Sequence, residues 1–182
     1  MSRHEIYISQ SFYANAIKKG IYLVLLHANR VPPHIGIMID NEYHSLTIKG
    51  QELNISGNVV LKNIGLRKIP ALFIKIKKHP VFSNQHLNES FIEQVKMFER
   101  VNSEGNTCLS PIRLFFEEFY AINKVKVSLV FDLLDALKEN EFISETCGMN
   151  LGETKGNIFY LQPYNEADLQ VQIETELKKI KV

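Results

Sequence analysis

A chain of 182 residues, with 45% hydrophobic and 23% charged residues, is long enough to bury a core of its own. Its 21 basic and 20 acidic residues leave a net charge of +1, which argues against a nucleic-acid partner. Two cysteines are too few for a disulfide framework or for a metal site built on cysteine pairs. The sequence lacks a signal-peptide pattern and an apolar run of the roughly 20 residues that span a membrane. We therefore expect a cytoplasmic protein with no membrane span, folded as a single domain over residues 1–182.

The first half of the chain predicts mostly β-structure. A continuous apolar run after Gly20, residues 21–26, is typical of a buried strand. Two prolines at 32–33 mark a connection, because proline cannot donate to a β-ladder. Turn-forming residues at 40–42 predict a β-hairpin between Ile35–Ile39 and Tyr43–Ile48. The other elements expected in this half are a strand and short helix within 6–19 and strands at 59–61 and 71–77.

The second half predicts mostly helices. Pro111 stands at the first position of one of them, where its missing N–H does no harm. A strand is expected at 157–162, after a loop at 141–157. The fold class that follows is α+β, with a sheet packed against a helix cluster. The residues expected to cap the helices are Asn88, Ser110, Ser128 and Asn165.

Two residues carry the chemistry that the sequence indicates. His34 begins a short apolar strand, and Cys108 stands just ahead of a helix. A cysteine attacks a carbonyl as its thiolate, and both a helix N-terminus and a nearby imidazolium favour that form. Each residue also has a structural interpretation, Cys108 as a small buried hydrophobic residue and His34 as the end of a strand.

The run Gly20-Ile21-Tyr22-Leu23-Val24-Leu25-Leu26, followed by His34-Ile35-Gly36-Ile37-Met38-Ile39, resembles the opening of circularly permuted NlpC-type papain-like hydrolases. This group includes the lecithin:retinol acyltransferase-like and YiiX-like proteins. The resemblance implies a papain-like core at about 20–140, with a small barrel-like antiparallel sheet on which the strand and helix of 157–182 pack. It also implies that His34 is the catalytic histidine, that Cys108 is the nucleophile, and that a third polar residue on the next strand orients the imidazole.

The sequence leaves that third residue open between His44, Ser45 and Thr47. A two-residue turn at Asp40-Asn41 pairs Thr47 with His34 and puts Ser45 on the same face of the hairpin. A three-residue loop brings His44 to that face instead, because a slip of one residue turns every side chain over. We favour His44, since a ring nitrogen orients an imidazole better than a hydroxyl does.

The function that the resemblance implies is a cysteine-dependent hydrolase or acyltransferase acting on an amide, peptide or ester carbonyl. Cys108 attacks, His34 acts first as base and then as acid, and backbone N–H groups near Cys108 hold the oxyanion. The expected substrate is a small molecule, a peptide or a lipid, and no cofactor is expected. His34, His44 and Cys108 are residue types that suit zinc, but their wide spacing does not favour a metal site.

A non-catalytic papain-like scaffold or binding protein with a degenerate site is the alternative. Pro111 favours a helix that starts after Ser110, which leaves Cys108 two residues outside it and weakens the help of the helix dipole. Leu109 is bulkier than the small or polar residue that usually follows the nucleophile in this group. The aromatic run at 115–120 covers more than one helical face, so it could leave surface for a partner or for a homo-oligomer.

Overall fold

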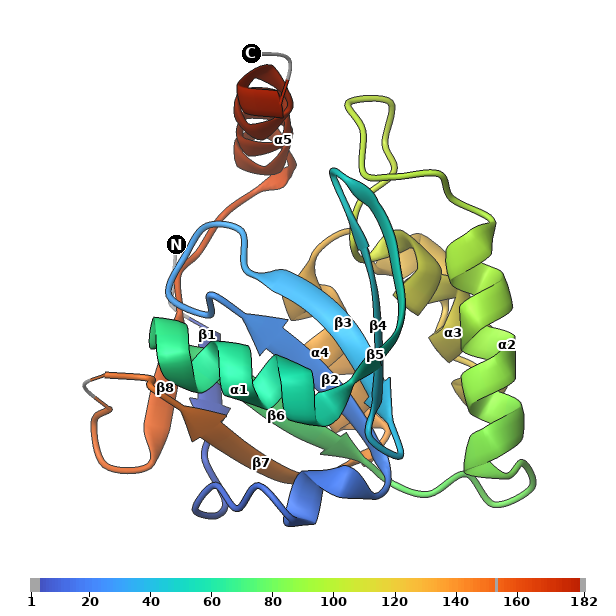
Figure 1. Cartoon of the computed structure of the whole chain (residues 1–182), viewed down its shortest axis with the longest axis vertical. Coiled ribbons are helices and arrows are strands. Elements are labelled where there is room, and N and C mark those ends of the chain that lie inside the picture. Colours follow the sequence, from blue (N-terminus) through green and yellow to red (C-terminus); the bar gives the residue numbers. More distant parts are fainter. Residues whose placement is uncertain (1–3, 153, 181–182) are drawn as a thin grey trace.

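The computed structural model describes residues 4–152 and 154–180 and shows an α+β fold (Figure 1), which confirms the predicted fold class. Its main sheet is antiparallel and open rather than closed into a barrel, with the strand order β5-β4-β3-β2-β6-β7. Each of its strands pairs only with its neighbours in that order. The strands are β2 (Ile21–Leu26), β3 (His34–Ile39), β4 (Glu42–Thr47), β5 (Gly50–Ser56), β6 (Ala71–Ile76) and β7 (Ile143–Met149).

A second, two-stranded sheet joins the first and the last strand of the described chain. β1 (His4–Tyr7) pairs antiparallel with β8 (Ile158–Leu161). The backbone N–H of Ser9 donates to the carbonyl oxygen of Thr146 at 2.9 Å, which attaches this small sheet to the outer edge of β7. The C-terminal strand therefore pairs with the N-terminal one and not with a strand of the main sheet.

Helices cover both faces of the main sheet (Figure 1). On one face, α1 (Gly57–Arg67) packs against Tyr22 and Val24 of β2. On the other, three helices pack against Leu23 and Leu25 of the same strand. Alternate residues of a strand point to opposite faces, so β2 is buried on both sides and reads as a continuous apolar run. The three helices are α2 (Asn84–Lys96), α3 (Ser110–Tyr120) and α4 (Val130–Glu139).

The last helix, α5 (Glu166–Ile180), is loosely attached. Asn165 caps it as predicted, because its side-chain oxygen accepts from the N–H of Asp168 at 3.0 Å. Among the residues of α5, Ile173 alone is buried, in a small cluster with Leu46 and Val101. No helix in the described part of the chain is long and apolar enough to cross a membrane.

The predicted hairpin between β3 and β4 forms around a two-residue turn. Asp40 and Asn41 have φ values of 44° and 71°, the left-handed conformation that a type I′ turn needs at both central positions. Ile39 therefore pairs directly with Glu42. This register fixes which side chains of β4 share a face with His34.

Several secondary-structure predictions are wrong. Residues 59–61 belong to α1 and not to a strand, and β5 and β7 were not predicted at all. α2 begins at Asn84, before the predicted cap Asn88, because the Ser83 hydroxyl accepts from the N–H of His86 at 3.2 Å. A short apolar run fits a helix or a strand equally well, and β5 and β7 carry too many polar residues to show a clear alternation.

Gly36 of β3 makes room for a tyrosine. A Cβ at this position would lie 2.5 Å from the Tyr43 hydroxyl oxygen and 2.6 Å from two ring carbons. Tyr43 is 2% exposed and packs in the core, so its ring would have to shift to accept the added methyl group. We expect Gly36→Ala to lower the free energy of unfolding by about 1–3 kcal/mol, the usual cost of overpacking a core, as measured by urea denaturation.

Gly65→Ala is the matched control for that change. Gly65 lies within α1, and a Cβ added there would meet nothing within 4 Å. Because alanine is the better helix former, this variant should be more stable than the parent by about 0.5–1 kcal/mol. Equal stability of the two variants would show that the contact between Gly36 and Tyr43 is not tight.

Candidate functional site

His34 lies where two strands of the main sheet separate. It opens β3 and pairs with Leu26 of β2. On the other side of β3, the pairing with β4 covers only Ile37–Ile39. The first three residues of β3 are thus left without a β4 partner, and the opening between the two strands is where Cys108 lies.

Cys108 is placed by a tight turn ahead of α3. The N–H of Thr107 donates to the Ser110 hydroxyl at 2.9 Å, and the N–H of Leu109 donates to the Thr107 hydroxyl at 3.2 Å. Leu109 is the N-cap and Pro111 lies in the first turn of the helix. Cys108 therefore directly precedes the cap, one residue nearer to the helix than the sequence predicts.

The thiol of Cys108 contacts the beginning of β3. Burial raises its pKa above the ordinary value, while backbone hydrogen bonds of Ile35, Cys108 and Leu109 act in the opposite direction. Ile35 directly follows His34, so this contact brings the two predicted site residues to the same place. Because burial has the larger effect, the resting group is a neutral thiol and not the predicted thiolate.

His34 is also neutral in its resting state. Burial lowers its pKa below the ordinary value of 6.5, with a smaller upward effect from the charge of Glu52 and a downward one from His27. Its Nε2 atom is buried and has no hydrogen-bond partner in the described part of the chain. Such unpaired buried nitrogens are rare in folded proteins. This one is available to a ligand or to the proton of a neighbouring group.

His44 does not join His34, and its assignment as the orienting residue is corrected. Because the turn has two residues, His44 pairs with Ile37 and faces α2. Its Nδ1 atom accepts from the N–H of Asn54 at 3.0 Å, and its Nε2 atom lies 2.9 Å from the Asn88 side-chain oxygen. These contacts satisfy both ring nitrogens. His44 thus supports the irregular β4–β5 pairing and has no free nitrogen for His34.

In the register that the two-residue turn sets, Ser45 lies on the same face of the β3–β4 hairpin as His34. The Ser45 hydroxyl donates to a carboxylate oxygen of Glu52 at 2.7 Å. Glu52 pairs with Ser45 across β4 and β5 and raises the pKa of His34, so it is the acidic group that acts on the imidazole. Sequence reasoning missed it because β5 was not predicted. A signal for the hairpin that joins β4 and β5 was available. Lys49-Gly50 lies between two stretches in which polar and apolar residues mix, and such a pair can form a turn.

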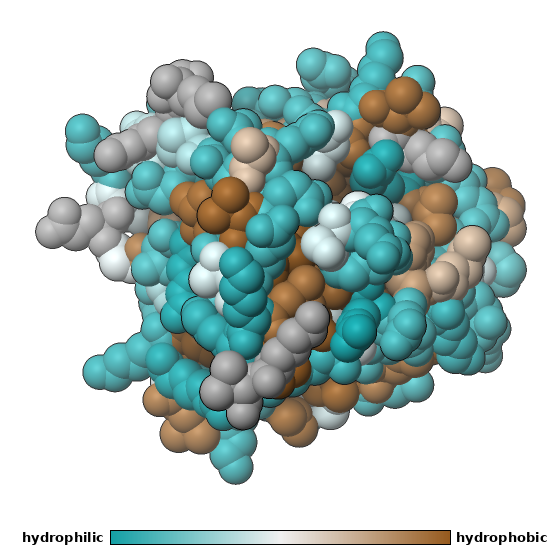
Figure 2. Space-filling model, turned by 90° about the horizontal axis from the view of Figure 1, so that it is seen from above, coloured by the Kyte–Doolittle hydropathy of each residue, from teal (hydrophilic) through white to brown (hydrophobic). Residues whose placement is uncertain are grey.

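A single cavity of about 730 Å³ joins these side chains. His34, Glu52 and Cys108 border it together with Thr47. Its other walls come from the β2–β3 loop, α1, the β4–β5 hairpin and α5. In Figure 1, α5 and the tip of the hairpin lie at the top, and α1 crosses the front of the sheet below them. Seen from the top, the surface shows apolar areas between hydrophilic ones (Figure 2).

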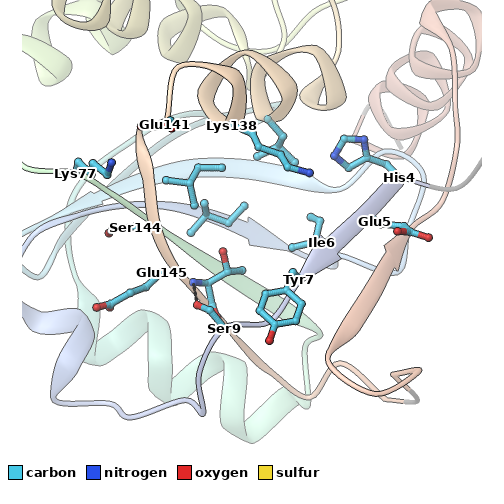
Figure 3. Close-up of a pocket in the computed structure, with 14 residues that line it drawn as sticks. His4, Glu5, Ile6, Tyr7, Ser9, Lys77, Lys138, Glu141, Ser144 and Glu145 are labelled. Carbon is cyan, nitrogen blue, oxygen red and sulfur yellow. Dashed lines mark hydrogen bonds between the residues drawn. The ribbon is translucent and has the colours of Figure 1, made fainter.

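A second cavity of about 460 Å³ lies between β1 and β7 (Figure 3). Ile6 and Ile143 contribute apolar surface to it, and Lys77, Lys138 and Glu145 border it. Neither His34 nor Cys108 reaches it. Among the described residues, no group of three histidine, cysteine, aspartate or glutamate side chains is placed to hold a metal ion.

Comparison of the chain with models of protein families, with curated proteins and with solved structures finds no match. A function is therefore inferred from the arrangement of His34, Glu52 and Cys108 around one cavity.

Proposed function

We propose that the protein is a cysteine-dependent hydrolase or acyltransferase that acts on an amide, peptide or ester carbonyl. The observation that carries this proposal is the meeting of two residues from distant parts of the chain. The Cys108 thiol contacts the backbone next to His34, whose buried Nε2 atom has no partner in the described part of the chain. Both residues border one cavity that is large enough for a substrate.

In the proposed reaction, His34 takes the proton of the Cys108 thiol as the sulfur attacks the carbonyl carbon. The C–S bond forms and the carbonyl electrons move to oxygen. When the tetrahedral intermediate collapses, His34 returns the proton to the leaving amine or alcohol, and Cys108 keeps the acyl group. Water or another acceptor then attacks the thioester with His34 again as base, which regenerates the thiol.

The resting protonation states support this sequence. A neutral imidazole that borders the same cavity as a neutral thiol can accept one proton, so the charges need form only when the carbonyl is present. The backbone groups of Cys108 and Leu109 that contact the sulfur are also the ones available to an oxyanion. A donor in that role commonly contributes about 3 kcal/mol. Glu52 stabilises the imidazolium that forms during the reaction.

A binding protein without catalysis is the second candidate. The raised pKa of the Cys108 thiol favours it, because reactive cysteines usually have lowered pKa values. In that case the cavity would hold a ligand, and Cys108 would only be part of its wall.

Acylation of Cys108 separates the two candidates. The protein is mixed with p-nitrophenyl hexanoate at pH 7.5, about one unit above the ordinary imidazole pKa. We expect a burst of about one p-nitrophenolate per chain. Rapid acid quenching and peptide mapping should place the hexanoyl group on Cys108.

The second cysteine supplies the control. Cys147 is buried in β7, and burial raises its pKa to about 11. Cys147→Ala should therefore keep the full burst, and Cys108→Ala should lose it. A burst that survives Cys108→Ala, or no acylation at all, would refute the catalytic proposal. The second candidate, a binding protein without catalysis, would then remain.

A further inference from the structure

One end of the large cavity is basic. His27, Arg30 and Arg67 all border it. His27 and Arg30 come from the β2–β3 loop, and Arg67 ends α1. The N–H of Ala28 donates to the carbonyl oxygen of Pro70 at 3.0 Å, which holds this loop against the segment that follows α1. We call these three residues the basic end of the cavity.

The two arginines have no acidic partner. Neither guanidinium forms an ion pair with a carboxylate in the described part of the chain. The two carboxylates that border the cavity are engaged elsewhere. Glu52 accepts from Ser45, and Glu176 pairs with Lys179. The charge of Arg30 also acts on His27 and helps to lower its pKa. Both arginines are exposed, so the basic end is the mouth of the cavity, where an anion would meet positive charge that no carboxylate compensates.

The basic end lies near the candidate catalytic pair. His27 follows β2, whose last residue pairs with His34, and the charge of His27 acts on the His34 ring. Most of the remaining wall is apolar. An occupant that matches the whole cavity has an apolar body and one anionic group. The side chains that provide this apolar wall include Leu26, Val31, Pro32, Ile55, Val60 and Ile64.

We propose that the cavity binds an elongated apolar molecule with a carboxylate, which is held by Arg30 and Arg67. Arginine pairs with a carboxylate through two parallel hydrogen bonds. The carboxylates of Glu52 and Glu176, which also border the cavity, favour one negative charge over the double charge of a phosphate. The assignment of this molecule as the substrate, with its scissile carbonyl at Cys108, rests on the proposed function.

Equilibrium binding tests the proposal without catalysis. In Cys108→Ser protein, which removes the nucleophilic sulfur, the fluorescent probe dansylaminoundecanoic acid is compared with its methyl ester. The two probes have the same apolar body and differ in the charge of the carboxyl group. We expect the acid to bind at least about tenfold more tightly. Arg30→Gln and Arg67→Gln should each lower the affinity for the acid by about tenfold and leave the affinity for the ester unchanged.

Arg100→Gln is the control, because Arg100 is exposed and does not border the cavity. It should leave both affinities unchanged. Equal affinity for acid and ester would overturn the proposal. Failure of the acid to bind, or binding that neither arginine variant weakens, would do the same. If the acid binds through the arginines but Cys108 is never acylated, the carboxylate site stands and the catalytic proposal fails.

Discussion

His34→Ala is expected to slow the acylation of Cys108 by about 10²–10⁴-fold, the usual contribution of a positioned general base. The cause is the state of the thiol. Burial raises the pKa of Cys108 above its ordinary value, so little thiolate exists at neutral pH unless a neighbour removes the proton. His34, with its unpaired Nε2 atom, borders the same cavity and is the proposed base.

The pH dependence of the burst rate gives the sharper measurement. Burial lowers the pKa of His34 below 6.5, so the imidazole stays in its basic form through the neutral range. The rate of the unmodified protein should be flat there and fall only as the pH drops through that lowered pKa. In His34→Ala the thiol must ionise alone, so the rate should rise about tenfold per pH unit, toward a thiol pKa above the ordinary 9.0.

An exposed histidine supplies the control for this series. His86 stacks on Phe82 at the surface, away from the cavity, and His86→Ala should keep both the rate and the flat profile. If His34→Ala had the same profile as the unmodified protein, His34 would not be the base.

Phe115→Ala is expected to lower the free energy of unfolding by about 3–5 kcal/mol, the range for removing a buried phenylalanine. Phe115 is fully buried, and its ring centroid lies 5.4 Å from that of Phe91 and 5.3 Å from those of Phe116 and Phe119. Phe91 belongs to α2 and the others to α3. The substitution thus leaves a cavity between α2 and α3, two of the three helices that cover this face of the sheet.

Urea denaturation measures that loss, provided that the slope against urea stays unchanged. Val81→Ala is the control, because Val81 is 77% exposed and its change should stay within about 0.5 kcal/mol. A loss below about 1 kcal/mol for Phe115→Ala would mean that α2 and α3 do not pack as closely as the ring distances indicate.

The secondary structure that the sequence predicts correctly is the strongly patterned part. Three patterns each predict a single structure. They are the apolar run of β2, the turn formers at Asp40 and Asn41, and the apolar stripe of α3. β5 and β7 are edge strands of the main sheet with many polar residues. β7 pairs with β6, which is distant in sequence, so no local pattern shows its partner. β5 pairs with the adjacent β4, but its polar residues obscure the hairpin.

Only part of the candidate site could be predicted, because local patterns show some of its residues and the tertiary structure determines the others. His34 and Cys108 could be chosen from their residue types and from their places before a strand and a helix. The orienting group depended on whether the turn has two or three residues, a difference that moves His44 to the opposite face. Glu52 could not be assigned without β5. The protonation states also lay beyond the sequence, because they depend on how deeply the tertiary structure buries the two side chains.

The weak attachment of α5 affects how quickly the cavity exchanges its contents. Leu169 and Ile173 of α5 border the cavity, yet Ile173 is the one buried side chain of that helix. Segments with few buried contacts detach locally at a free energy well below that of global unfolding. Detachment of α5 would therefore widen one side of the cavity, while the six-stranded sheet stays intact. A ligand that leaves by this side would then exchange faster in a variant whose α5 is further loosened, such as Ile173→Ala.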